Sequence, residues 1–221
     1  MSTAQLLPTL AESPEELLAA QVDYCDALVE LSTVHSELRS PAKAVPLLRR
    51  ATEMLTSMHG EESEQTLECN DMLAKALGEA GEAGEVVPTL RRSLDIKRLV
   101  HGESSQEVAD CHNELAVALQ EMGESAMAEE QARSALTLHI DLFGESHVYT
   151  GTCICNLATL LHSQGKLHPA EMLLRHCVRI YEAELGKEPT ALQEPHTAHV
   201  LSHCPLCHVP PQVRRTRTQS R

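Results

Sequence analysis

Residues 99–123 read LVHGESSQEVADCHNELAVALQEMG, and close relatives of this stretch occur before and after it at one fixed interval. The interval is 42 residues, as one ladder of glycines shows: Gly60, Gly102, Gly144 and Gly186. A second ladder at the same step contains Gly81, Gly123 and Gly165. A period of this size is typical of helical arrays, in which each unit leaves an apolar face that only its neighbours can cover. We therefore expect a repeating pair of helices with one turn after each helix.

The apolar residues of each unit fall on one face of each expected helix. In the first helix the pattern is i, i+1 and i+4, found at Leu31/Ser32/His35, Leu73/Ala74/Leu77, Leu115/Ala116/Leu119 and Leu157/Ala158/Leu161. In the second helix it is i, i+4 and i+7, found at Ala44/Leu48/Ala51, Val86/Leu90/Ser93, Ala128/Ala132/Ala135 and Ala170/Leu174/Cys177. Both spacings place their residues on one side of an α-helix. The sequence thus predicts four helix pairs, the last three over roughly residues 61–101, 103–143 and 145–185.

Prolines indicate where several of these helices begin. Ser13 and Pro14 are typical of a helix start, because Ser can cap the first turn and Pro fits within it. Pro46 and Pro88 are again 42 residues apart. We interpret them as first-turn residues of the second helices, where the backbone does not yet need an amide donor, and we give Pro169 the same role.

The period divides the chain into three segments. Residues 1–14 carry two prolines and no periodic apolar face, which predicts a flexible leader. Residues 15–187 are the expected helical repeat domain. The five prolines and several histidines that follow predict a disordered tail over residues 188–221. The array then ends near Leu185 without an evident polar capping helix, which leaves the far side of the fourth unit apolar unless a partner, a second copy or the tail covers it. Oligomerisation through this uncapped end and truncation of a longer array are the two open interpretations.

The net charge of −14 is unevenly distributed. Residues 1–188 hold 14 Lys+Arg against 31 Asp+Glu, whereas residues 189–221 hold 4 against 1. An acidic body repels phosphate backbones and anionic membrane surfaces, so we expect no nucleic acid or membrane partner and favour a basic or mixed-charge protein segment. The N-terminus has no basic-led apolar run, and no stretch of about 18 apolar residues occurs. These features predict a cytoplasmic protein.

Three of the eight cysteines, Cys69, Cys111 and Cys153, occupy the same position in consecutive units. Such positions are separated by two helix spacings of about 8–10 Å each, which exceeds the ~7 Å limit for a disulfide. We expect these cysteines to be small buried apolar residues.

The unit resembles the tetratricopeptide repeat family. The matching residues are the Leu-Ala-x-x-Leu of the first helix, the Gly seven or eight positions after its Ala, and the small residues of the second helix. The longer, 42-residue unit with an Asn-Leu-Ala in its first helix looks like the kinesin light chain type, at residues 143–147, 155–158 and 112–116. The resemblance covers roughly residues 16–187. It implies an all-α fold, a right-handed superhelical array of antiparallel helix pairs whose first helices line a concave groove.

What the family resemblance implies for function is protein binding. The expected activity is that of a scaffold or adaptor that holds a peptide segment of a partner protein in the groove. A kinesin light chain-like cargo adaptor in microtubule-based transport is the alternative within the same family.

The candidate groove residues are the polar positions of the first helices: Asp71, Lys75, His112, Asn113 and Asn156. Side-chain amides on a groove can bind a peptide backbone through paired donors and acceptors, without removing a charge from water. The alternative interpretation is that these are solvated helix residues or helix caps.

A basic cluster lies on the expected second helix of the second unit and contains Arg91, Arg92, Lys97 and Arg98. It could receive an acidic peptide. We favour a solvated helix face, or pairs with nearby Glu residues, because second helices usually form the outer side of such arrays.

Residues 203–208 read HCPLCH and form the one sharp chemical motif. Cys204, Cys207 and His208 could bind zinc, with His196 and His199 as further candidates, and Cys-x-x-Cys-His is also an attachment pattern for c-type haem. Haem requires an export signal and an apolar pocket, and zinc usually requires a second ligand pair at set spacing. We favour incidental residues in a disordered tail, and we expect no metal and no cofactor. Because neither a nucleophile triad nor a glycine-rich phosphate loop is found, we do not expect an enzyme.

Overall fold

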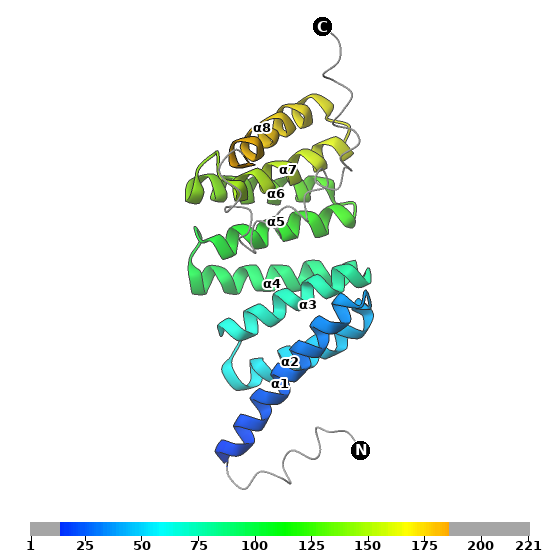
Figure 1. Cartoon of the computed structure of the whole chain (residues 1–221), viewed down its shortest axis with the longest axis vertical. Helices are drawn as coiled ribbons and strands as arrows, with labels where there is room; N and C mark the ends of the chain where they lie inside the picture. The colour runs from blue at the N-terminus through cyan, green and yellow to red at the C-terminus, as the bar shows by residue number, and fades with distance from the viewer. Residues whose placement is uncertain (1–13, 186–221) are drawn as a thin grey trace. The chain divides into compact units, whose positions relative to one another are not determined.

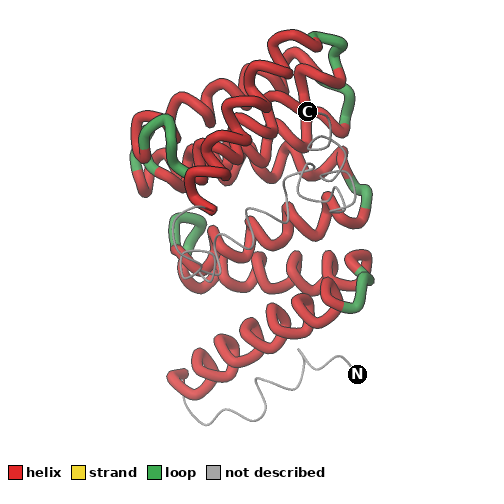
Figure 2. The backbone as a smooth tube through the Cα atoms, turned by 45° about the horizontal axis from the view of Figure 1, so that its top comes forward, coloured by secondary structure: helices red, strands yellow, loops and turns green. Residues whose placement is uncertain are grey.

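The computed structural model describes residues 14–185, and all regular secondary structure in this range is helical (Figure 1). The helices are α1 (Pro14–Glu37), α2 (Pro41–His59), α3 (Glu64–Ala80), α4 (Ala83–His101), α5 (Gln106–Glu121), α6 (Ser125–Phe143), α7 (Val148–Ser163) and α8 (Leu167–Leu185). They form two compact units, of which unit 1 contains α1–α4 and unit 2 contains α5–α8. Within each unit short turns join the helices into two pairs (Figure 2). The predicted all-α fold of helix pairs is confirmed.

The two glycine ladders occupy equivalent turns. Gly60, Gly102 and Gly144 end α2, α4 and α6 with φ of 84°, 88° and 87°, and the N–H of each donates to the carbonyl four residues earlier. The second ladder follows α3, α5 and α7 with φ between 76° and 81°. Glycine takes such positive φ values without the steric cost that a Cβ would add. The predicted turns are confirmed at these six glycines, whereas Gly186 lies outside the described residues.

Buried threonines fix the turn between the pairs of each unit. The Thr66 hydroxyl donates to the Gly60 carbonyl at 2.8 Å, and the Thr150 hydroxyl donates to the Gly144 carbonyl at 2.8 Å. Both threonines are fully buried, so each hydroxyl satisfies a carbonyl that the preceding helix leaves unpaired at its end. The same contact therefore sets the direction of the chain in both units.

The predicted apolar faces form the core, with one exception. The first-helix trios are buried in α3, α5 and α7, and the second-helix trios are buried in α2, α4 and α6. In α8, Ala170 and Cys177 are buried and Leu174 is half-buried. In α1, by contrast, Leu31 is 46% exposed. The apolar pattern of α1 therefore has a different role from that of the later first helices.

Cys69, Cys111 and Cys153 are buried free thiols, as predicted. Each lies on the face of its helix that packs into the core. Their regular spacing therefore reflects helix packing and not disulfide formation.

The interpretation of Pro46 and Pro88 as first-turn residues is wrong. Because α2 begins at Pro41 and α4 begins at Ala83, each proline is an interior residue in the second turn. At this depth an amide would donate to the carbonyl four residues earlier, and proline cannot do so. Both prolines are exposed, so water can solvate the carbonyl that lacks its helical donor. Pro169 does lie in the first turn of its helix, α8.

Several predicted features lie outside the described residues. They are the leader over residues 1–14, apart from Pro14, the tail over residues 188–221, and the motif residues Cys204, Cys207 and His208. Between residues 14 and 185 no helix combines the length and apolar character that crossing a bilayer requires.

Candidate functional site

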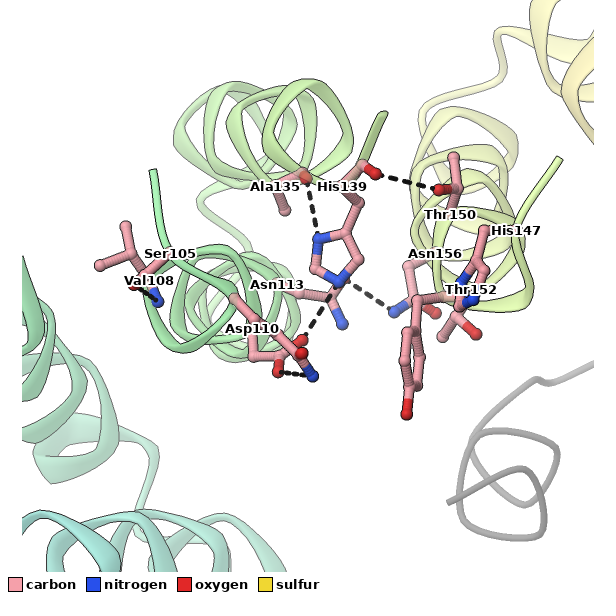
Figure 3. A network of polar contacts seen from close by, with 12 residues as sticks. Ser105, Val108, Asp110, Asn113, Ala135, His139, His147, Thr150, Thr152 and Asn156 are labelled. Atoms are coloured by element: carbon pink, nitrogen blue, oxygen red, sulfur yellow. Dashed lines mark hydrogen bonds and ion pairs between the residues drawn. The ribbon is translucent and has the colours of Figure 1, made fainter. Parts of the chain in front are cut away.

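Two of the candidate groove residues, Asn113 of α5 and Asn156 of α7, meet in unit 2. The Nδ2 of Asn156 donates a hydrogen bond to the Oδ1 of Asn113 at 3.0 Å, and both side chains are half-buried. The helices α5 and α7 are the first helices of their pairs and contact each other directly. Figure 3 shows the two side chains extending toward one another from neighbouring helices. We call Asn113 and Asn156 the amide pair.

The amide pair keeps unused hydrogen-bonding capacity at both ends. After the internal bond, Asn113 still has its amide N–H groups, and Asn156 still has its carbonyl oxygen. An extended peptide presents alternating N–H and C=O groups, which match a donor and an acceptor held a short distance apart. The pair is therefore suited to contact a peptide backbone.

A carboxylate and an imidazole adjoin the amide pair. The Oδ1 of Asp110 on α5 lies 3.2 Å from the Nε2 of His139 on α6. The His139 ring is buried, and its Nδ1 lies 3.2 Å from the Ala135 carbonyl oxygen. Asp110 precedes Asn113 by one helical turn, so both project from the same side of α5 (Figure 3). This face of unit 2 therefore combines amides with one half-exposed carboxylate.

Hydroxyl groups extend the same face along α7. The Thr152 hydroxyl lies 3.2 Å from the Tyr181 hydroxyl of α8. Thr152 precedes Asn156 by four residues and projects from the same side of its helix. We name the surface formed by Asp110, Asn113, Thr152 and Asn156 the first-helix face.

The cysteine beside this face is not a nucleophile. Burial raises the pKa of the Cys153 thiol to about 12, and the nearby Asp110 carboxylate adds to the increase. A protonated thiol neither attacks substrates nor ligates metals. Among the described residues, no three His, Cys, Asp or Glu side chains are placed to hold a metal ion. The groups that the face presents are hydrogen-bond donors, acceptors and a carboxylate.

In unit 1, the candidate residue Asp71 is bonded to α4. The Lys97 Nζ donates to the two Asp71 carboxylate oxygens at 2.8 and 2.7 Å, and the Ser93 hydroxyl donates at 3.1 Å. The Lys97 side chain is buried, so this ion pair links α3 to α4 within their shared core. Lys75, one turn further along α3, is exposed.

His112 contacts α6 and is buried. Its Nδ1 lies 2.7 Å from the Gln131 Oε1. It lines a hollow of about 620 Å³ in unit 2 together with residues of the preceding turn and of α6: Glu103, Ser104, Ala126, Glu130, Arg133, Ser134, Thr137 and Leu138. The hollow has a mixed polar and apolar lining and does not include the amide pair.

The basic residues of the second helices mostly pair with acids of the same chain. Arg49 lies 2.5 Å from Glu85, and Arg92 forms an ion pair with Glu61. These two acids come from other elements, whereas Arg98 lies 3.9 Å from Asp95, one turn earlier on the same helix. The interpretation of the basic cluster as an acidic-peptide site therefore has weaker support than that of paired surface residues.

Sequence reasoning missed Asp110, His139, Thr152 and Tyr181. Asp110 and Thr152 could have been found, because each lies one helical turn before a candidate asparagine. His139 and Tyr181 lie on second helices, and only the packing of those helices brings them close to this face.

The family model described as tetratricopeptide repeat matches residues 107–183, which extend from α5 into α8. Comparison with curated proteins found no match. Among solved structures, BtubC (BKLC) from P. vanneervenii has a TM-score of 0.68 at 19% identity, covering 81% of this chain and 69% of that chain. TPR-like repeats assigned to a kinesin light chain of Podosopora anserina have a TM-score of 0.64 at 20% identity, covering 92% of each chain. A Rap protein complexed with Competence and Sporulation Factor has a TM-score of 0.60 at 10% identity, covering 82% of this chain and 52% of that chain.

These likenesses agree with the helix pairs, the glycine turns and the 42-residue period described above. The match over residues 107–183 corresponds to the two complete helix pairs of unit 2. Residues 107–183 therefore match tetratricopeptide repeats, and the fold of the chain is that of the tetratricopeptide-like repeat proteins.

Proposed function

We propose that this chain is a protein-interaction scaffold that binds a peptide segment of a partner protein along the first-helix face. The observation that carries the proposal is the amide pair. It joins two neighbouring first helices and keeps a donor and an acceptor for a peptide backbone. In this proposal Asn113 and Asn156 contact the peptide main chain, and the Asp110 carboxylate favours a basic side chain on the peptide.

Two further observations support binding of a polypeptide. Tetratricopeptide repeats match the unit that contains the amide pair. A Rap protein of similar fold is known in complex with Competence and Sporulation Factor. Both favour a scaffold that acts by holding a partner.

The proposal can be tested with a peptide selected from a random library displayed on phage. The selected peptide is synthesised, and its Kd is measured by fluorescence anisotropy against the full chain and two double variants. Asn113→Ala/Asn156→Ala should weaken binding about ten-fold or more, equivalent to about 1.4 kcal/mol or more. Ser134→Ala/Thr137→Ala removes hydroxyls beside the hollow of α6 and should leave the Kd unchanged.

The opposite pattern would contradict the proposal. Unchanged binding by the asparagine variant would exclude the amide pair as the peptide contact. Loss of binding in the Ser134 and Thr137 variant alone would place the site at the hollow. Proximity labelling with the intact chain would then identify natural partners for the same comparison.

As an alternative within the same class, we propose a cargo adaptor of the kinesin light chain type. The likeness that favours it is to TPR-like repeats assigned to a kinesin light chain, which covers 92% of each chain. The adaptor should co-sediment with microtubules in the presence of kinesin heavy chain. Absence from the pellet would leave the general scaffold function as the proposal.

We further propose that the protein is cytoplasmic and that it can self-associate through the outer side of α8. Among the residues that the structure describes, six buried cysteines are free thiols, which fits a reducing compartment. Leu167, Met172 and Val178 of α8 are exposed apolar side chains. Sedimentation should show a concentration-dependent dimer that Met172→Asp/Val178→Asp removes, and a monomer at all concentrations would contradict the association.

The segment limits and the tail motif also remain proposals. Limited proteolysis should remove residues 1–14 and 188–221 and leave residues 15–187 intact. A zinc site at Cys204, Cys207 and His208 would require about one zinc per chain in metal analysis of the purified protein. A much lower zinc content would exclude it.

A further inference from the structure

Helix α1 carries a second apolar stripe, whose first three residues are half-buried and whose later residues are exposed. Cys25, Leu28 and Ser32 are its buried residues. On another side of the helix, apolar residues alternate at steps of three and four, at Leu17, Ala20, Tyr24, Ala27, Leu31 and Val34, and Leu38 continues the pattern directly after α1 ends. Leu31, Val34 and Leu38 are 46%, 47% and 65% exposed. We call these seven residues the α1 stripe.

Equivalent faces of later helices in this chain are covered by another helix. Ala27, Leu31 and Val34 correspond, one period of 42 residues later, to Cys69, Leu73 and Ala76 of α3. All three of these α3 residues are buried. Helix α2 covers that face of α3, and the Thr52 hydroxyl of α2 lies 3.2 Å from the Cys69 Sγ. In unit 2, α6 packs against α7 in the same way. By this internal comparison, the α1 stripe fits a helix.

The spacing of the stripe defines the geometry of that helix. Alternating steps of three and four place the seven residues at the a and d positions of a heptad repeat. Large residues, Leu or Tyr, occupy one of the two positions, and the smaller Ala or Val occupies the other. A helix that packs on this seam would therefore carry apolar residues with the same period.

Acidic residues follow one edge of the stripe at seven-residue steps. Asp23, Glu30 and Glu37 each precede a large stripe residue, and all three are exposed. None of them forms an ion pair with another described residue. Flanking charges at this heptad position select the partner by pairing with opposite charges. The edge of the stripe therefore favours Lys or Arg on the incoming helix.

A second copy of α1 does not supply these positive charges. In an antiparallel pair the acidic edges would face each other and repel. In a parallel pair they would face the other edge, which carries Gln21, Leu28 and His35. The net charge of −14 also opposes association of two copies.

We infer that the α1 stripe binds an amphipathic helix of a partner protein whose apolar heptad positions are flanked by Lys or Arg. This site is separate from the first-helix face of unit 2 and goes beyond the proposed function. It would give the protein a helix-binding surface in addition to a peptide-binding one. Failure of either site leaves the other unaffected.

The test uses the full chain and two synthetic peptides about four heptads long. Both have Leu at the a and d positions, and they differ only in carrying Lys or Glu at the flanking positions. Binding is measured by fluorescence anisotropy with each peptide labelled. The Lys peptide should bind at least about ten-fold more tightly than the Glu peptide, and added salt should reduce the difference.

Three variants localise the binding. Leu31→Asp/Val34→Asp should weaken binding of the Lys peptide about ten-fold or more. Leu99→Asp changes an exposed leucine of α4 and should have no effect. Asp23→Lys/Glu30→Lys/Glu37→Lys should reverse the preference toward the Glu peptide, which a variant that had merely lost its fold could not do.

Other results would overturn the inference. One is equal binding of the two peptides, and another is binding that survives Leu31→Asp/Val34→Asp. A dimer in sedimentation that this same variant abolishes would assign the stripe to a second copy. If the peptide binds only after residues 1–12 are deleted, the occupant of the α1 stripe is residues 1–12 of the same chain and not a partner helix.

Discussion

At the scale of single residues, Arg39 shows how a helix end tolerates an unsuitable side chain. It has φ of 53°, whereas the equivalent residues of the later repeats are Gly81, Gly123 and Gly165. The Arg39 N–H donates to the Ser36 carbonyl, as the Gly81 N–H donates to the Gly78 carbonyl. The turn is thus the same, but in the first repeat a residue with a Cβ adopts the left-handed conformation that glycine favours.

Arg39→Gly should therefore stabilise the protein by roughly 0.5–1 kcal/mol, since relief of the left-handed strain exceeds the entropy that glycine adds to the unfolded chain. Urea denaturation would measure the change. As a control, Arg50→Gly in the interior of α2 should destabilise by about 1 kcal/mol. A loss of stability in Arg39→Gly would show that the strain is relieved in some other way.

Cys153 gives a prediction about reactivity. Its pKa of about 12 leaves roughly one thiol in ten thousand ionised at pH 8, and only the thiolate reacts with alkylating reagents. Cys153 in the native protein should be alkylated by iodoacetamide at least about 100-fold more slowly than in the unfolded chain. Mass spectrometry of a timed pulse would give both rates, and rapid native labelling would contradict the burial described here.

At the scale of elements, Glu129 joins one helix pair of unit 2 to the next. Its carboxylate on α6 accepts a hydrogen bond at 2.7 Å from Lys166, which lies in the turn between α7 and α8. The Glu129 side chain is only 10% exposed. The bond to Lys166 lowers the pKa of Glu129, with Arg133 contributing and burial opposing. A buried carboxylate held in this way couples the two pairs.

Lys166→Met should cost roughly 1–3 kcal/mol at pH 7, because it leaves Glu129 with one fewer partner. Because folding lowers the pKa of Glu129, the stabilisation is complete at pH values above the ordinary pKa of Glu. It is lost as the pH falls through the lowered pKa of the folded protein. The difference from wild type should therefore shrink in acid. Arg175→Met is the matched control, because its pair with Glu171 is exposed and should change stability by less than about 1 kcal/mol. Equal effects of both variants would contradict a special role for Glu129.

Packing between neighbouring helices also predicts the effect of a core deletion. Leu115 of α5 is 2% exposed, so Leu115→Ala should cost roughly 2–5 kcal/mol through lost burial and a cavity. Leu99→Ala, at a position 77% exposed, should change stability by less than about 0.5 kcal/mol. Thermal melts of the two variants would measure this contrast, and a small loss in Leu115→Ala would show that α5 contributes little to its unit.

At this scale the sequence predicted the helix pairs and their turns, because glycine and apolar spacing are local signals. It misplaced Pro46 and Pro88, since both second helices start one turn before the prolines. The trio Leu31, Ser32 and His35 of α1 has the same spacing as the trios of the later first helices. Whether such a trio is buried also depends on whether another helix covers that face. Leu31 is therefore exposed where Leu73 is buried.

The candidate site was less predictable from the sequence than the fold. Asn113 and Asn156 are 43 residues apart, one more than the period, so the repeat pattern alone does not bring them together. Their contact depends on how α5 and α7 pack. Likewise, His112 neighbours Asn113 in sequence, yet one residue along a helix turns the side chain toward α6 and the hollow.

At the scale of the whole molecule, the acidic charge and the arrangement of helices point to protein partners. Most basic side chains on the described second helices pair with acids of the chain and therefore do not form a free positive surface. The net charge of −14 favours basic segments of a partner protein. The first-helix face offers hydrogen bonds to a peptide backbone, and the α1 stripe offers an apolar seam with an acidic edge. The two surfaces suit an extended peptide and a basic helix, respectively.

NMR of the asparagine side chains reports directly on whether a partner peptide binds at the amide pair. The chain contains three asparagines, Asn70, Asn113 and Asn156, so selective ¹⁵N labelling gives three pairs of side-chain N–H signals, one pair for each NH₂ group. During titration with the library-selected peptide, the signals of Asn113 and Asn156 should shift together and saturate at the measured Kd, while Asn70 of α3 stays in place. Saturable binding that leaves the Asn113 and Asn156 signals unmoved would show that the peptide binds elsewhere on the protein.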